Sequence, residues 1–224
     1  MFLNIAKQYI ILVITLKMLF TFSCNSPTTN DCNIDILECC NENLINFINV
    51  NNTICNSNST LYNINCYIQV MEDMYKNGNE KDLLNICNAY INYKNCLQNS
   101  FSKCLSKNYL NNFLSNQNVV YNILNFIRKI TFVCGPGLES LLINNECISS
   151  VFQEKENKLK KCWIDFEESS EEATICANLN VYIRCYTNIF LTNCNSESAW
   201  WSCEYGKANI SSIYPQCYIQ CNFS

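Results

Sequence analysis

The density of cysteine constrains this chain more than any other feature. Eighteen of its 224 residues are Cys, about 8%, which is near the level that marks a disulfide scaffold. The alternative is metal binding, but the chain has no His, and no Cys pair recurs at zinc-ribbon spacing. We therefore expect disulfides and no metal site. The cysteines expected to form them are Cys24, Cys32, Cys39, Cys40, Cys55, Cys66, Cys87, Cys96, Cys104, Cys134, Cys147, Cys162, Cys176, Cys185, Cys194, Cys203, Cys217 and Cys221.

Residues 1–23 have the pattern of a secretory signal peptide. Lys7 precedes an apolar run over 10–22 that Lys17 interrupts. A membrane span needs about 20 apolar residues in a row, so the interruption favours a cleaved signal over a retained anchor. Cleavage immediately before Cys24 would keep all the cysteines in an oxidising compartment. No second long apolar stretch follows. We expect a secreted extracellular protein without a transmembrane segment in the mature chain.

The scarcity of Gly and Pro indicates helices. The chain has four Gly and three Pro, and a β-sandwich of this length would need more turn formers. Segment 119–134 shows helical periodicity best, because its apolar residues recur at three- and four-residue steps. Gly135 and Pro136 predict its end. The expected fold class is all-α: a disulfide-rich helical bundle.

A second helix is expected over 151–166. Its pairs Glu154 with Lys158 and Glu156 with Lys160 have the favourable i,i+4 order. The apolar face of this helix is expected to comprise Phe152, Leu159, Trp163 and Phe166. The acidic run that follows, 167–172, is interpreted as a solvated connector, since the ordered ligand spacing of a calcium loop is missing.

The cysteine spacing suggests two degenerate copies of one helical module. Cys87, Cys96 and Cys104 recur as Cys176, Cys185 and Cys194 at offsets of 89, 89 and 90 residues. The expected modules are 24–140 and 141–224, and one continuous domain is the alternative. The outer matches proposed on looser spacing are Cys55 with Cys147, Cys66 with Cys162, and Cys134 with Cys217.

Two copies that were each stable alone should have closed sets of bridges. We therefore expect disulfides within each module and not across them. Cysteines nine residues apart on one helix point to opposite sides, so Cys87 should not pair with Cys96. The same argument holds for Cys176 and Cys185. Adjacent cysteines would form a strained ring, so Cys39 should not pair with its neighbour.

The absence of His removes the familiar nucleophilic mechanisms, because no other side chain titrates unperturbed near neutral pH. Paired carboxylates could in principle serve glycoside hydrolysis, but no context marks a pair. No glycine-rich phosphate loop occurs. We expect no enzyme activity, no catalytic residues and no cofactor. A net charge of -4 and a basic cluster limited to 158–161 give no reason to expect nucleic acid. The pair Trp200–Trp201 could anchor a partner, but burial of one Trp beside a disulfide is favoured.

Three Asn-x-Ser/Thr sequons are candidates for N-glycosylation. They begin at Asn51, Asn58 and Asn209. Asn222 also begins one, but it lies too near the end of the chain to be a good acceptor.

The cysteine pattern resembles that of nematode secreted proteins. From Cys87 the chain reads Cys-x8-Cys-x7-Cys, then a long helix, then Phe-Val-Cys ending at Cys134, which resembles the chondroitin proteoglycan 4 type domain. The part from Cys176 to Cys217, which ends in Tyr-Pro-Gln-Cys, also resembles nematode domain-of-unknown-function family 19. The resemblance implies a secreted helical nematode protein, with chondroitin on Ser-Gly in some relatives. No Ser-Gly occurs here, so chondroitin attachment is not expected.

These observations leave two hypotheses for function. The first is a non-catalytic structural or interaction role, associated with extracellular matrix or with a partner in a body fluid. The second is an extracellular carrier that binds an apolar small molecule in an interhelical pocket.

Expression in a secretory host should yield N-glycosylated protein. Enzymatic removal of N-glycans should lower its apparent mass on electrophoresis, because at least one sequon is expected to be occupied. Chondroitinase should leave the mass unchanged, since Ser-Gly is absent. A mass shift with chondroitinase would restore a proteoglycan role.

Overall fold

The fold is all-helical over the residues described by a computed structural model, which are Cys24, 31–48, Cys55, 64–169 and 171–221. No strand occurs in these ranges, so the predicted all-α, disulfide-rich fold class is confirmed. The signal peptide expected over 1–23 lies outside them. The helices are α2 (Ile34–Ile48), α3 (Ile64–Lys76), α4 (Glu80–Leu97), α5 (Phe101–Cys104), α6 (Lys107–Leu110), α7 (Gln117–Val133), α8 (Leu138–Ile143), α9 (Asn145–Glu154), α10 (Glu156–Ser169), α11 (Ile175–Asn193) and α12 (Ser196–Ile210), with 3-10 turns η1 (Gln98–Ser100) and η2 (Glu172–Thr174).

Asparagine begins several of these helices. The side-chain oxygen of Asn79 accepts a hydrogen bond from the backbone N–H of Lys81 at the start of α4. Asn116 and Asn195 do the same at the starts of α7 and α12. An Asn at this position satisfies a backbone donor that has no partner inside the helix. Part of the abundant Asn therefore defines where helices start.

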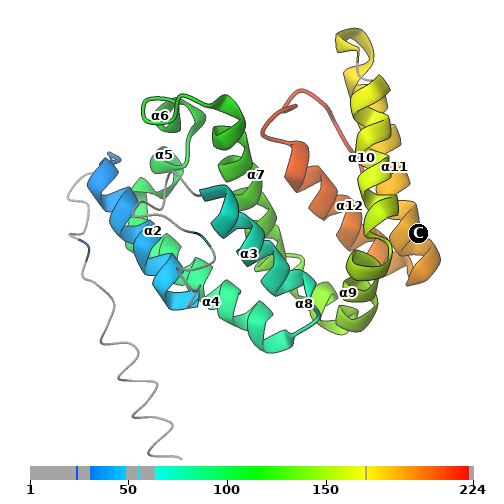
Figure 1. Cartoon of the computed structure of the whole chain (residues 1–224), viewed down its shortest axis with the longest axis horizontal. Coiled ribbons are helices and arrows are strands. Elements are labelled where there is room, and N and C mark those ends of the chain that lie inside the picture. Colours follow the sequence, from blue (N-terminus) through cyan, green and yellow to red (C-terminus); the bar gives the residue numbers. More distant parts are fainter. Residues whose placement is uncertain (1–23, 25–30, 49–54, 56–63, 170, 222–224) are drawn as a thin grey trace, which may run out of the picture.

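The helices form a layered bundle in which α7 and α12 are central (Figure 1). The pair α2 and α4 lies along one edge, and the pair α10 and α11 lies along the opposite edge. α7 packs on α12, so helices of both expected modules share one cluster of buried side chains. The expected boundary at 140/141 falls inside α8. No helix in the described ranges is long and apolar enough to cross a membrane.

The structure pairs all eighteen cysteines, each of which lies in the described ranges. No bridge joins a cysteine up to Cys134 to one from Cys147 onward, as expected. Cys39 and Cys40 do not pair with each other, and neither do the cysteines nine residues apart on α4 or α11. The bridges are Cys24–Cys39, Cys32–Cys104, Cys40–Cys96, Cys55–Cys66, Cys87–Cys134, Cys147–Cys194, Cys162–Cys185, Cys176–Cys217 and Cys203–Cys221.

Three bridges in each segment follow one ordered pattern. The matched pairs are Cys32–Cys104 with Cys147–Cys194, Cys40–Cys96 with Cys162–Cys185, and Cys87–Cys134 with Cys176–Cys217. The expected matches of Cys87, Cys96, Cys104 and Cys134 with Cys176, Cys185, Cys194 and Cys217 agree with this pattern. The expected matches of Cys55 and Cys66 are wrong, because these two cysteines pair with each other. The bridges show instead that Cys32 is the counterpart of Cys147 and that Cys40 is the counterpart of Cys162. Spacing alone does not reveal this, because it does not show which cysteines pair.

The predicted helix over 119–134 is confirmed as α7, but the helix expected over 151–166 is broken at Lys155. α9 ends at Glu154, and α10 begins at Glu156. The break changes one ion pair: Glu154 contacts Lys155 and not Lys158, whereas Glu156 pairs with Lys160 as expected.

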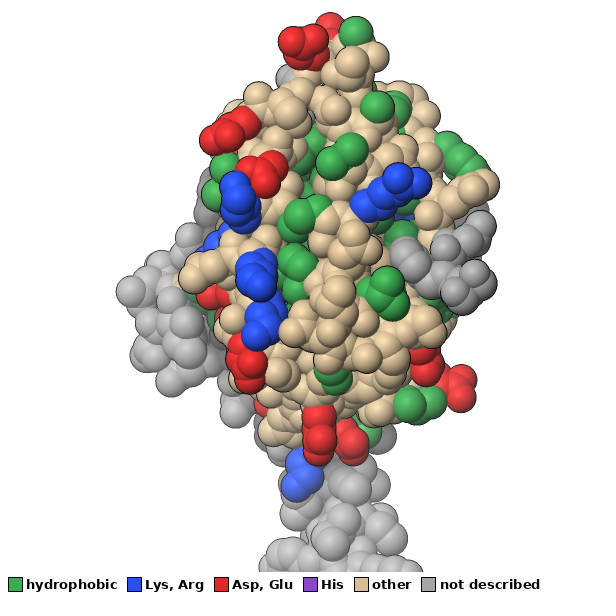
Figure 2. Space-filling view, turned by 90° about the vertical axis from the view of Figure 1, so that its right-hand side faces the viewer, with side chains coloured by type: hydrophobic (Ala, Val, Ile, Leu, Met, Phe, Trp, Pro, Cys, Tyr) green, Lys and Arg blue, Asp and Glu red, His purple; other side chains and the backbone are tan. Residues whose placement is uncertain are grey.

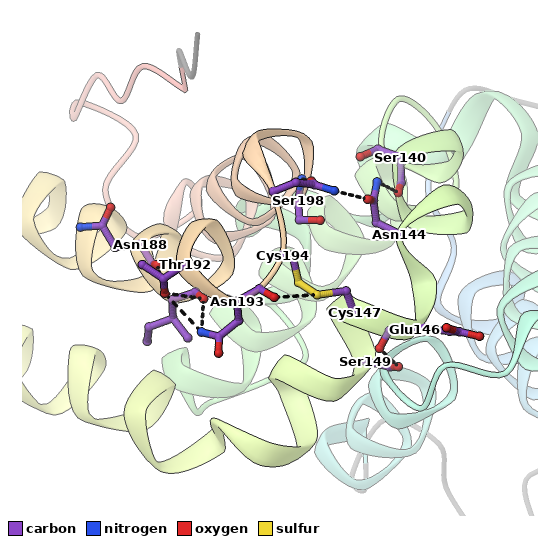
Figure 3. The surroundings of a disulfide bond; sticks show 12 residues. Ser140, Asn144, Glu146, Cys147, Ser149, Asn188, Thr192, Asn193, Cys194 and Ser198 are labelled. Carbon is purple, nitrogen blue, oxygen red and sulfur yellow. Dashed lines mark hydrogen bonds between the residues drawn. A yellow bond between two sulfur atoms is a disulfide. The ribbon is translucent and has the colours of Figure 1, made fainter.

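The first helical turns of α9 are fixed to the end of α11. Cys147 is bridged to Cys194, and its sulfur lies 3.3 Å from the carbonyl oxygen of Asn193 (Figure 3). Nearby, the Asn195 side chain donates a hydrogen bond of 2.7 Å to Oδ1 of Asn144. The start of α9 is thereby held in place independently of α10.

One tryptophan of the Trp200–Trp201 pair is a core residue, as favoured from the sequence. Trp201 is fully buried, stacks on Tyr205 with ring centroids 5.0 Å apart, and donates a hydrogen bond from Nε1 to the carbonyl oxygen of Gly137. Trp200 is only partly buried, against Phe132. The four glutamates of the run 167–172 are exposed as expected, but Glu167 and Glu168 belong to the last turn of α10 and Glu172 begins η2, so the run is not wholly a connector.

Removal of matched bridges tests the repeated pattern. The double variants Cys87→Ser/Cys134→Ser and Cys176→Ser/Cys217→Ser should each lower the free energy of unfolding by about 2–5 kcal/mol, because each releases a long closed loop. Guanidinium denaturation followed by circular dichroism measures the change. Peptide mapping of unreduced wild-type protein is the check on pairing: a peptide that links the two segments would contradict the pattern.

Candidate functional site

A groove of about 860 Å³ lies between α3 and the four helices α9 to α12. Its walls therefore come from both halves of the chain. The side chains on the α3 side are Gln69, Asp73 and Lys76, followed by Asn77. The opposite side comprises Gln153, Glu156, Lys160 and Ile164 of α9 and α10. All of these residues except Lys76 are exposed, so the groove opens to solvent.

The floor of the groove is aromatic. Trp163 of α10 meets Tyr182 of α11 edge to face, with ring centroids 5.3 Å apart, and Tyr182 contacts Tyr186 one turn further along. Phe152 of α9 lines the same floor and packs against Phe190. Trp163 and Phe152 are half-buried, whereas the two tyrosines are buried. The floor is thus an apolar surface on which the rings of Trp163 and Phe152 are partly accessible.

A buried charge cluster lies beside this floor, at the junction of α3 and α7. Glu72 of α3 forms ion pairs with Lys76, at 2.6 Å, and with Lys129 of α7. Side-chain exposure is only 10% for both Glu72 and Lys129. Burial opposes ionisation of Glu72, but the two ammonium groups outweigh burial and hold the pKa of this carboxyl below its usual range. Burial lowers the pKa of Lys129, and the charge of Glu72 opposes that change.

Tyrosine hydroxyl groups complete the cluster. Tyr75 and Tyr205 share a hydrogen bond of 3.0 Å, and burial raises the pKa of both well above its usual value. Burial also raises the pKa of Tyr182 to about 12, against the effect of a hydrogen bond from Asn209. These hydroxyls stay protonated at neutral pH. The Lys76 ammonium lies 5.4 Å from the ring centre of Phe152, a cation–π contact at the edge of the floor.

The titratable groups beside the floor have fixed protonation states near neutral pH. The carboxyl of Glu72 is held ionised by two cations, and the tyrosines hold their protons, so neither group is poised to transfer a proton near neutral pH. What the groove offers is ring surface, hydroxyl donors and amides. Such a combination of apolar floor and few polar groups is typical of ligand sites.

Two other features are weaker candidates. An apolar cavity beside Leu37, Met71 and Phe126 has a volume of about 30 Å³, which is too small for any ligand larger than water. Among the described residues, the sulfurs of Cys24, Cys40 and Cys96 converge within 4.8 Å. Each belongs to a disulfide, so none is the thiolate that a metal would need.

The outer face of α10 and α11 carries isolated apolar side chains. Figure 2 shows hydrophobic groups spread over this face, with Lys and Arg side chains among and beside them. Ile164, Val181 and Leu191 are 48%, 66% and 41% exposed. Ile164 also lines the groove, so the groove is continuous with this face.

Only one of the three predicted glycosylation sites lies among the residues that the structure describes. Asn209 lies on α12, is partly buried and lines the groove beside Tyr182. A glycan on this side chain would occupy the groove, so ligand binding there requires chains that are unmodified at Asn209. Asn51 and Asn58 lie outside the described residues.

Sequence reasoning missed most of the groove. Trp163 and Phe152 stood on the expected apolar face, and Lys160 was assigned to a solvated helix face. No sequence pattern marked Gln69, Asp73 or Tyr186, because they come from helices that are far apart in the chain. Comparison with family models, with curated proteins and with solved structures finds no match to this chain.

Replacing Glu72 by Gln tests the charge cluster. The variant Glu72→Gln should lose about 3–5 kcal/mol of stability at neutral pH, because it leaves buried Lys129 without its counter-charge. The folded-state pKa of Glu72 is lowered, so its contribution is present above the ordinary glutamate value of about 4.3 and is lost as pH falls through the folded pKa. The difference from wild type should therefore shrink in acid.

The matched control is Glu156→Gln, which removes an exposed ion pair with Lys160. It should cause no measurable loss of stability, because exposed pairs contribute little. Chemical denaturation at a series of pH values measures both variants. Equal stability of Glu72→Gln and wild type at neutral pH would contradict the role assigned to the cluster.

Proposed function

We propose that the protein is a secreted, non-catalytic binding protein that holds its ligand in the groove between α3 and α9–α12. The observation that carries this proposal is the groove itself, whose volume of about 860 Å³ is within the range of ligand sites in proteins. Its aromatic floor supplies contact area, and its polar rim supplies specificity. The binding partner is an extracellular component, such as a constituent of the matrix.

Two features support an extracellular setting. The structure has nine disulfides, and disulfides form and persist in oxidising compartments but are rare in the reducing cytosol. The N-terminal pattern over 1–23 has the charge and apolar run of a signal peptide. A non-catalytic role is supported by the absence of His from the sequence and by the ion pairs that occupy Glu72.

A carrier for an apolar small molecule is the second candidate. The aromatic floor and the volume favour it, since a carrier pocket of at least about 300 Å³ would suffice. The exposed amide and charged side chains of the rim favour the first candidate, because an apolar ligand would cover these groups without giving them hydrogen bonds.

Native mass spectrometry can test the proposal on protein recovered from its own secretions. The wild-type chain should carry a noncovalent adduct, and recombinant protein incubated with the same fluid should regain it. The variant Trp163→Ala should lose the adduct, because it removes a half-buried aromatic ring from the floor.

The control is Tyr218→Ala, which removes an aromatic ring that is 78% exposed and does not line the groove. This variant should keep the adduct. No adduct on the wild-type chain, or equal adduct on Trp163→Ala, would overturn the groove as the binding site.

A further inference from the structure

The chemistry of the groove indicates a class of ligand, an inference that rests on the proposed function. Its floor presents the half-buried ring of Trp163 beside Tyr182 and Phe152. A sugar ring has C–H bonds on one face, and these pack well on an aromatic face, whose electron density is highest there. A flat hydrocarbon-like face edged by hydroxyl groups fits such a floor.

The rim supplies neutral groups that both donate and accept hydrogen bonds. Gln69 uses its Nε2 to donate to Asp73 at 2.9 Å, and Gln153 uses its Nε2 to approach the backbone oxygen of Asn77. These contacts leave the carbonyl oxygens of both amides for a ligand. An amide donates through its NH₂ and accepts through its oxygen, which matches a hydroxyl that does both.

The charged side chains that line the groove, two acidic and two basic, sum to zero. Lys76 is paired with Glu72 at 2.6 Å, and Lys160 is paired with Glu156 at 2.7 Å. Asp73 accepts a hydrogen bond from Gln69. A polyanion would compete with Glu72 and Glu156 for the two lysines and would meet the carboxylate of Asp73, and a cation would meet two ammonium groups. An uncharged ligand binds without either cost.

Two other uncharged ligands fit less well. An acyl chain would bury the rim amides and Asp73 without hydrogen bonds. A peptide bound as an added strand would need an open strand edge, and the walls of this groove are helices whose backbone groups are bonded internally. We propose that the groove binds a neutral oligosaccharide, with one sugar ring stacked on Trp163 and hydroxyl groups bonded to Gln69 and Gln153.

Isothermal titration calorimetry with neutral tetrasaccharides of glucose, N-acetylglucosamine, galactose and mannose tests the proposal. The protein should carry Ser211→Ala, which removes the sequon at Asn209 but keeps that side chain in the groove. At least one tetrasaccharide should bind. Trp163→Ala should weaken it by at least about tenfold, as expected of an aromatic anchor. Gln69→Ala should weaken it by about fivefold, the effect of one hydrogen bond. Tyr218→Ala should leave it unchanged.

A sulfated heparin tetrasaccharide, lysophosphatidylcholine and an uncharged tetrapeptide form the other arms of the experiment. None should bind in a manner that depends on Trp163. Binding of one of these three that Trp163→Ala abolishes, without any neutral sugar binding, would overturn the sugar assignment but leave the groove as the binding site. If a neutral sugar bound equally well to Trp163→Ala and to wild type, the proposal that a sugar ring stacks on Trp163 in this groove would also be overturned.

Discussion

Two long helices, α4 and α11, determine where their neighbours lie. Each carries two cysteines nine residues apart, Cys87 and Cys96 or Cys176 and Cys185, which point to opposite sides of the helix. Each helix is therefore bridged on both sides: α4 to α2 and to the end of α7, and α11 to α10 and to the segment after α12. The core between them then forms where α7 and α12 pack. Cross-links on opposite faces make each helix the middle of a three-part unit.

The same constraint explains why α9 and α10 are two helices. Cys185 on α11 and Cys194 directly after it are nine residues apart, about 13.5 Å at helical rise, but their partners Cys162 and Cys147 are fifteen residues apart, about 22.5 Å in a straight helix. A straight helix over 147–162 would leave these two bridges mismatched by about 9 Å along the axis, and the break at Lys155 relieves that mismatch. In the first segment both spacings are eight residues, from Cys32 just before α2 to Cys40 on it and from Cys96 on α4 to Cys104 on α5, so no such mismatch arises there. The break gives α9 and α10 different directions, and both helices then line the groove opposite α3.

The features of this structure that could be predicted from the sequence are those that depend on residues close together in the chain. Helix α7 was predictable because its apolar residues recur at regular steps, and the locality of the bridges followed from the repeated spacing around Cys87 and Cys176. The counterparts of Cys147 and Cys162 could not be predicted, because cysteine spacing does not show which cysteines pair with each other. The groove was missed for the same reason: Gln69, Trp163 and Tyr186 are unremarkable on their own helices and gain meaning only where three helices converge.

The position of the buried Glu72 ion pairs beside the groove gives them a role other than stabilising the fold. Ion pairs out of water often stabilise a fold no more than apolar side chains of the same size would, since desolvation offsets attraction. Here the cluster lies where α3 meets α7 and where Lys76 also reaches the groove edge. Pairing with Glu72, which Lys76 shares with Lys129, holds the Lys76 ammonium beside Phe152 and gives this wall a fixed polar edge. An apolar replacement would pack equally well but would leave that wall without its fixed polar edge. The cluster is therefore best understood as shaping the binding surface, with its contribution to stability a consequence of the pairing that this shape requires.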